Sequence, residues 1–276
     1  MDISHLIEKY SLSDFTSVKR INPSAYWDEV KLADVMTVTD LDWLTNNFTS
    51  FSLKNYTSLE DLDLTGVPCD LMCDDFFKSK SLKDLTKLGG KIKLKKSFCE
   101  LSALRKLKFI AVHVTSLPRL FGNLNMLEEL WLCDTLIKKL PESFSNLTSL
   151  TKLSIYPKLI NIDAGFPMNL EEADLRGNKL STIPESLLSL PKLKNLDISD
   201  NPFDQLPETT NNSLESLRLA RTPFGIFKCN ISKLRELYPN CKVEEPVAYA
   251  DDKTLYLSST KLYYSAKYLK GHYSNH

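Results

Sequence analysis

The pattern Leu-x-x-Leu-x-Leu recurs along most of this chain at intervals of 20 to 23 residues. Its copies hold their phase over about residues 59–243. They begin at Leu59, Leu82, Leu104, Leu127, Leu150, Leu170, Leu193, Leu214 and, in truncated form, Leu234. A repeat of this length is one supersecondary unit that cannot bury its apolar face alone and must stack on its neighbours. The repeat therefore predicts a single elongated solenoid.

Each recurring position has a physical role. Counting from the first leucine, apolar residues at positions 4 and 6, such as Leu130 and Leu132, have the period of a short strand with one buried face. Asn178 and Asn201 stand at position 9, where a buried amide can bond the turning backbone. Proline at position 15, as in Leu140-Pro141, prevents a second sheet from continuing. Apolar residues three apart then predict a short helical turn. This set is Phe121 with Leu124, Phe144 with Leu147, and Leu187 with Leu190.

These motifs resemble the leucine-rich repeat family, most closely its intracellular class with a 23-residue LPxxφ return. The resemblance implies an α/β fold, a curved solenoid with a parallel sheet on the concave face and short helices or irregular turns on the convex face. The copies of 20 and 21 residues depart from that class. The copy at 82–103 departs most, with Lys87 at an apolar position and Gly89-Gly90 just after the strand. We expect a bulge or a local distortion there.

The flanks divide the chain further. Residues 1–37 carry no repeat and are predicted to be an N-terminal helical cap with a helix around Leu6, Ile7 and Tyr10. Residues 38–58 are predicted to be a degenerate first repeat, which places the leucine-rich repeats at 38–243. A closing half-repeat puts a helix through Leu234 and Leu237 and a strand at 241–243. Residues 244–276 are tyrosine-rich and are predicted to form a cap or a tail, with a helix at about 260–270.

Composition restricts the partner and the compartment. The formal net charge is zero, which argues against nucleic acid as a partner, and no apolar run is long enough for membrane insertion. The start of the chain shows no signal-peptide pattern. Six cysteines without framework spacing fit reduced thiols, so we expect a cytoplasmic monomer. Five Asn-x-Ser/Thr sequons favour an extracellular alternative. They begin at Asn47, Asn55, Asn146, Asn211 and Asn230.

Catalytic and cofactor motifs are weak. His113 falls at position 10 of its repeat, where a solvated loop residue is expected. Cys69 and Cys73 have no partners at zinc spacing, and Gly89-Gly90 is the sole glycine pair. We therefore expect no enzyme activity, no cofactor and no metal. A cysteine enzyme is the alternative from another class, and a thiol-directed activity probe would detect it.

The candidate site is the concave sheet face, where the resemblance implies that partners dock. Trp131 stands at position 5, which strand alternation turns toward solvent, and Ile110, Cys133 and Tyr156 stand at position 7 on its own and adjacent strands. An aromatic centre with a mixed charged rim is typical of a protein interface. The predicted rim residues are Lys106, Lys108, Glu129, Lys152, Asp174, Arg176, Asp197 and Arg218.

The sequence therefore predicts a non-catalytic scaffold that recognises a protein partner on its concave face. Two alternatives use the same fold: a bacterial effector or host-interaction protein, and an extracellular receptor-like fragment. A third reading is that Trp131 is covered within the chain, for example by the tyrosine-rich tail, and serves no partner.

Overall fold

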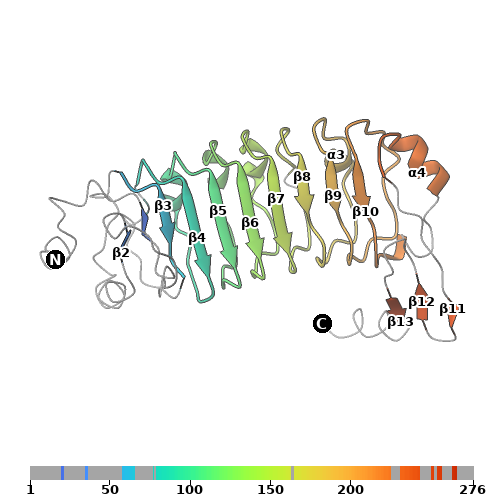
Figure 1. Ribbon diagram of the computed structural model, residues 1–276, viewed down its shortest axis with the longest axis horizontal. Helices are drawn as coiled ribbons and strands as arrows, with labels where there is room; N and C mark the ends of the chain where they lie inside the picture. The colour runs from blue at the N-terminus through green and yellow to red at the C-terminus, as the bar shows by residue number, and fades with distance from the viewer. Residues whose placement is uncertain are drawn as a thin grey trace, which may run out of the picture.

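The computed structural model of the chain describes residues 20–21, 35–36, 58–65, 77, 79–162, 165–224, 231–242, 250–251, 254–256 and 263–265. Within these residues the protein is an elongated, curved solenoid with one long parallel sheet, as the repeat predicts (Figure 1). The repeats supply eight of its strands, in sequence order. They are β3 (Asp61–Asp63), β4 (Asp84–Leu88), β5 (Lys106–Ile110), β6 (Glu129–Cys133), β7 (Lys152–Tyr156), β8 (Glu172–Asp174), β9 (Asn195–Asp197) and β10 (Ser216–Arg218).

The core runs the length of the solenoid between the strands and the returning chain. The first leucine of every repeat from Leu59 to Leu214 has no exposed surface, and the residues at position 4 are buried beside it. Short helical turns cover the convex side, as predicted: η5 (Lys96–Glu100), η6 (Phe121–Asn123), η7 (Glu142–Asn146) and α3 (Glu185–Leu188). Phe98 and Phe121 stack there with ring centroids 6.3 Å apart. The convex face is therefore held by packed rings and leucines rather than by a second sheet.

Position 8 turns the chain away from each strand through the left-handed region. Its φ is positive in six repeats. The residues are Gly89 (68°), Ala111 (54°), Asp134 (52°), Gly177 (67°), Asp200 (57°) and Arg221 (58°). Glycine adopts this conformation at the least steric cost, yet only two of the six are glycines. The stacking of neighbouring repeats imposes the turn even where the residue disfavours it.

The bulge expected around Lys87 is absent. Strand β4 is five residues long and pairs regularly with β5, with Lys87 opposite Phe109. Lys87 lies in the core with 1% of its surface exposed, and its Nζ donates a hydrogen bond to the carbonyl oxygen of Leu64 at 3.4 Å. The distortion falls after the strand, where Gly89 and Gly90 have successive positive φ angles of 68° and 71°. A long side chain whose ammonium reaches a main-chain carbonyl thus fits an apolar position without breaking the ladder.

The side chains of aspartate at position 5 and asparagine at position 9 together replace some main-chain hydrogen bonds between neighbouring strands. Asp174 Oδ1 accepts a hydrogen bond from the main-chain N–H of Arg176, so this N–H does not pair with the preceding strand. Asn178 Nδ2 then donates to the carbonyl oxygen of Ile155 on that strand at 2.7 Å. Asp197 and Asn201 make the corresponding contacts with Ser199 and Leu175. Strands β8 and β9 therefore end after three residues, whereas β4 to β7 extend for five.

At the N-terminal end the sheet continues beyond the repeats. Strand β1 (Arg20–Ile21) pairs in parallel with β3, and β2 (Val35–Met36) pairs with β1. The neighbour of β3 thus comes from the segment assigned to the helical cap and not from the degenerate repeat at 38–58. The predicted helix around Leu6 and residues 38–57 lie outside the described residues, so these two assignments stay predictions.

At the C-terminal end the helix of the closing half-repeat forms as expected. Helix α4 (Ile231–Leu237) buries Leu234, and Tyr238 just after it has no exposed surface. Lys242 forms an isolated bridge with Ser216 on the last strand. The helix predicted at 260–270 is wrong. A separate antiparallel sheet of β11 (Ala250–Asp251), β12 (Thr254–Tyr256) and β13 (Tyr263–Ser265) occupies this part, since Thr and Tyr favour strands over helices. A capping role for residues 244–276 stays a prediction.

Candidate functional site

The strand register aligns the side chains predicted for the concave face. Cα pairing across the sheet runs through position 5 in one continuous row. The row is Asp63, Thr86, Lys108, Trp131, Ser154, Asp174, Asp197 and Arg218. Because neighbouring parallel strands lie about 4.8 Å apart, these side chains form one surface.

Trp131 lies near the middle of this row and is 37% exposed, although the row around it is polar. The ammonium group of Lys108, on the adjacent strand, lies 5.6 Å from the centre of its ring. Arg176 lies at the same 5.6 Å from the ring of Tyr156. Cations over aromatic faces stabilise exposed rings by about 0.5–1 kcal/mol. Trp131 therefore faces solvent and is not part of the core.

Cys133 is not on the exposed surface, contrary to the expectation for position 7. It is 3% exposed, because larger side chains, Ile110 and Tyr156, flank it on the adjacent strands. Its Sγ lies 3.7 Å from Ser154 Oγ. Its contact with Tyr156 and the partial burial of that ring raise the pKa of Tyr156. Cys133 therefore supports the aromatic surface from below and does not itself offer a contact.

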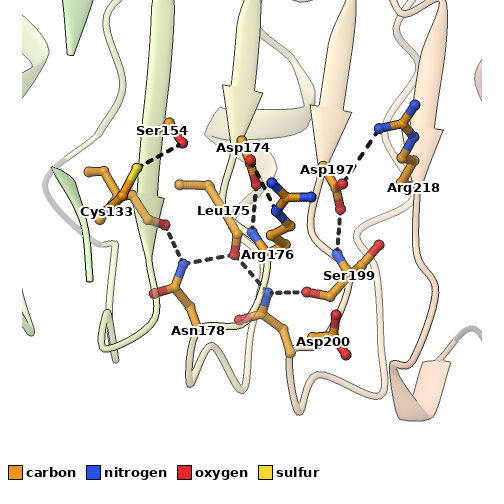
Figure 2. Close-up of polar contacts among 12 residues, drawn as sticks. Cys133, Ser154, Asp174, Leu175, Arg176, Asn178, Asp197, Ser199, Asp200 and Arg218 are labelled. Carbon is orange, nitrogen blue, oxygen red and sulfur yellow. Dashed lines mark hydrogen bonds and ion pairs between the residues drawn. The ribbon is translucent and has the colours of Figure 1, made fainter. Parts of the chain in front are cut away.

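An open depression of about 440 Å³ lies on the C-terminal side of Trp131. Asp174 and Asp197 line it from paired positions of neighbouring strands, and Arg176 and Arg218 line it as well. Figure 2 shows each arginine beside its aspartate. Arg176 Nε lies 3.2 Å from Asp174 Oδ2, and Arg218 Nη1 lies 3.8 Å from Asp197 Oδ2. The depression thus combines one aromatic wall with a balanced set of charges.

The Asp174 carboxyl group lies partly buried in this depression. Burial raises its pKa, and the nearby Asp197 carboxylate acts in the same direction. The N–H and the charge of Arg176 oppose this rise. Two aspartates side by side at position 5 are therefore tolerated because each has an arginine nearby.

The remaining charges of the concave face are mostly paired between neighbouring strands. Lys106 Nζ lies 3.3 Å from Glu129, and Lys152 Nζ lies 3.5 Å from Glu172. Further pairs join position 2 of adjacent repeats: Lys83 with Glu60, Arg105 with Glu128, and Lys194 with Glu171. Exposed pairs of this kind contribute about 0.2–1 kcal/mol each, so a partner can replace them at low cost.

The structure divides the predicted site at Trp131. The depression contains Trp131, Lys152, Asp174, Arg176, Asp197 and Arg218 from the predicted set. Ile110, Tyr156, Lys106, Lys108 and Glu129 lie outside it, over strands β5 to β7. The sequence reasoning missed Glu172, Asn195 and Ser216, which also line the depression. The sequence could have predicted them, because all three stand at position 3 in register with Lys152.

Metal-binding groups do not assemble in the described part of the chain. Within it, no three His, Cys, Asp or Glu side chains could hold a metal ion together. His113 is exposed, as expected, and forms an isolated bridge with Lys91. Cys69 and Cys73 lie outside the described residues. No helix in the described ranges could span a membrane.

Comparisons with known proteins agree with this architecture. The family model described as leucine rich repeats (2 copies) matches residues 169–209. No curated protein matches the chain.

Solved structures with a similar fold come from several sources. A leucine-rich repeat protein of Leptospira interrogans superposes with a TM-score of 0.55 at 22% identity, covering 77% of this chain and 61% of that one. The LRIM1/APL1C complex gives 0.59 at 21% identity, covering 68% of this chain and 35% of that one. An internalin from Listeria monocytogenes gives 0.52 at 17% identity, covering 80% of both. The chain thus spans less than two thirds of the first two.

Proposed function

The chain belongs to the leucine-rich repeat family, and from this premise we propose that it is a non-catalytic module that recognises a protein partner on its concave face. The observation that carries the proposal is the 37% exposure of Trp131 beside an open depression of about 440 Å³. Tryptophan is enriched among the residues that dominate binding energy at protein interfaces.

The charges around Trp131 support a protein partner over other ligand classes. Asp174 and Asp197 alternate with Arg176 and Arg218, so the depression has no excess of positive charge for a phosphate backbone. Its open form and mixed polarity fit a folded surface or a loop, which presents both charges and apolar groups. The LRIM1/APL1C structure, which superposes on this chain, is itself a complex, and this is consistent with the proposed role.

The remaining assignments follow from the same proposal. We propose a cytoplasmic location, because the scattered cysteines fit a reducing compartment. We further propose that the chain is a monomer and acts as a scaffold. An extracellular receptor-like fragment is the second candidate, favoured by the exposed sequon at Asn146.

The test begins with partners captured on the immobilised chain and identified by mass spectrometry. Each is then titrated by calorimetry against the wild type and the Trp131→Ala variant. We expect Trp131→Ala to weaken binding by about 2 kcal/mol or more, roughly thirtyfold, as the loss of a central anchor does. Met168→Ala removes another exposed apolar side chain, 61% exposed, and is expected to leave affinity unchanged.

A stability measurement separates an interface residue from a structural one. Trp131→Ala should cost about 1 kcal/mol or less of unfolding free energy, whereas Leu130→Ala in the core should cost about 2–5 kcal/mol. Unchanged binding together with a large loss of stability in Trp131→Ala would contradict the proposal.

A further inference from the structure

The turns that follow the strands form an edge of their own, at the lower side of the sheet in Figure 1. Main-chain hydrogen bonds join these turns from repeat to repeat. His113 N donates to Gly90 O at 2.8 Å, and Leu136 N donates to Val114 O at 3.0 Å. Lys91 and His113 also form a parallel bridge. Side chains at equivalent positions of these turns therefore lie beside one another at the repeat spacing.

Positive charge is concentrated along this edge and at the start of the convex side, where Lys96 begins η5. Positions 9 to 16 of the repeats that start at Leu82, Leu104 and Leu127 contain seven lysines and arginines but one carboxylate, Glu142, although the whole chain has a net charge of zero. All seven are exposed. The six other than Lys95, which has an interaction of its own, are called the basic edge here. They are Lys91, Lys93, Lys96, Arg119, Lys138 and Lys139.

The basic edge differs from the concave face in how its charges are compensated. On the concave face Lys106, Lys152 and Arg176 each lie within 4 Å of a carboxylate. No residue of the basic edge has such an ion pair or a side-chain hydrogen bond in the part of the chain that the structure describes. An anionic partner can therefore engage these cations without first breaking an internal pair.

An apolar groove lies within the basic edge. It measures about 850 Å³, and Lys96 and Arg119 line it together with Leu94, Leu120 and Leu140. The carboxylate of Glu142 also lines it, so the groove has two cations and one anion. Leu120 is 40% exposed between these cations, and Leu94 is half-buried. Grooves of this size accommodate several side chains.

We propose that the basic edge and its groove bind an acidic peptide segment of a protein partner, with a large apolar side chain of that segment against Leu120. The charge requires an anion, and the groove requires an apolar group next to it. A nucleic-acid phosphate backbone or a lipid headgroup layer supplies the anion without the adjacent apolar group. This surface is separate from Trp131 and goes beyond recognition on the concave face.

The experiment uses the full chain and fluorescein-labelled peptides of equal length, followed by fluorescence anisotropy. The first peptide alternates Glu and Asp around a central Leu-Phe-Leu, the second has Ser in place of these apolar residues, and the third has Lys in place of its acids. We expect the first peptide to bind most tightly, the second about tenfold more weakly and the third not at all. Added NaCl should weaken binding of the first peptide, because the pairs are exposed.

Variants locate the binding on the chain. Arg119→Glu and Lys139→Glu should each reduce affinity for the acidic apolar peptide about tenfold, while Lys192→Glu, an exposed lysine outside the edge, should have little effect. Leu120→Ala should reduce the affinity to that of the serine peptide. Trp131→Ala should leave it unchanged, so failure of this proposal and failure of concave-face recognition are distinguishable. Circular dichroism melts check that each variant is folded.

Three results would overturn the proposal. The first is no binding of the acidic apolar peptide. The second is equal affinity for the serine peptide, which would show that the apolar groove does not contribute to binding. The third is tighter binding of single-stranded DNA or of phosphatidylserine vesicles, measured in the same assay, which would assign the basic edge to a polyanion or a membrane surface.

Discussion

The amide group of Asn178 replaces a strand hydrogen bond to Ile155: Nδ2 donates to the carbonyl oxygen of Ile155 at 2.7 Å, where the next strand has already ended. The same Nδ2 donates to Leu175 O at 2.8 Å, and Oδ1 accepts from Leu159 N at 2.9 Å. One buried side chain thus satisfies main-chain groups of two successive repeats.

Asn178→Ala should therefore be strongly destabilising. It leaves buried main-chain groups without partners, and we expect a loss of about 2–3 kcal/mol in unfolding free energy, measured by urea denaturation. Asn195→Ala, on the exposed side of β9, is the matched control and should change stability by less than about 0.5 kcal/mol. Equal midpoints for the two variants would show that the asparagine is dispensable.

Cysteine reactivity should follow burial. Cys99 and Cys133 are buried, and burial raises the pKa of the Cys99 thiol to about 11. Both thiols should resist a disulfide reagent at pH 8 in the native protein and react once guanidinium unfolds it. Peptide mapping by mass spectrometry identifies the labelled residues. Rapid labelling of Cys133 in the native protein would instead show that its thiol is exposed.

Stability should fall in alkaline solution. Burial raises the pKa of Tyr238 to about 12 and that of Cys241 to about 11, from 10.0 and 9.0. Above pH 9 the unfolded chain loses these protons before the folded chain does, so the unfolding free energy decreases as pH rises from 9 toward 12. Urea denaturation across this range measures the effect.

Tyr238→Phe isolates the tyrosine in that series. The buried Tyr238 Oη has no hydrogen-bond partner in the described structure, so its removal should raise stability at pH 7 by about 1 kcal/mol. The decrease in stability above pH 10 should also be smaller in this variant. A destabilised Tyr238→Phe protein would show that the hydroxyl group is satisfied in solution.

Glycan acceptance should differ between two sequons if the chain is expressed through a secretory host. Asn146 is exposed, whereas Asn211 is 5% exposed and its Nδ2 donates to Leu188 O at 2.7 Å and to Leu190 O at 3.0 Å. Site-specific glycopeptide analysis should find Asn146 modified and Asn211 unmodified. A glycan on Asn211 would require that this turn be modified before it folds.

The sequence alone determined the solenoid and the register of its sheet. A constant repeat length brings equivalent positions together, and the period of two along each strand separates the buried face from the exposed one. For this reason the row from Asp63 through Trp131 to Arg218 was predictable residue by residue, and so were the buried leucines and the bonding role of Asn178.

The tertiary structure decided what pattern alone does not encode, because exposure, charge pairing and strand choice depend on neighbours distant in sequence. Cys133 is covered since Ile110 and Tyr156 are larger than it is, and Lys87 is accommodated since its ammonium reaches Leu64 O. Helical spacing in residues 260–270 was overridden because Tyr263–Ser265 pairs with Thr254–Tyr256. The cations around Leu120 are brought together, without carboxylate partners among the described residues, only by the stacking of successive turns.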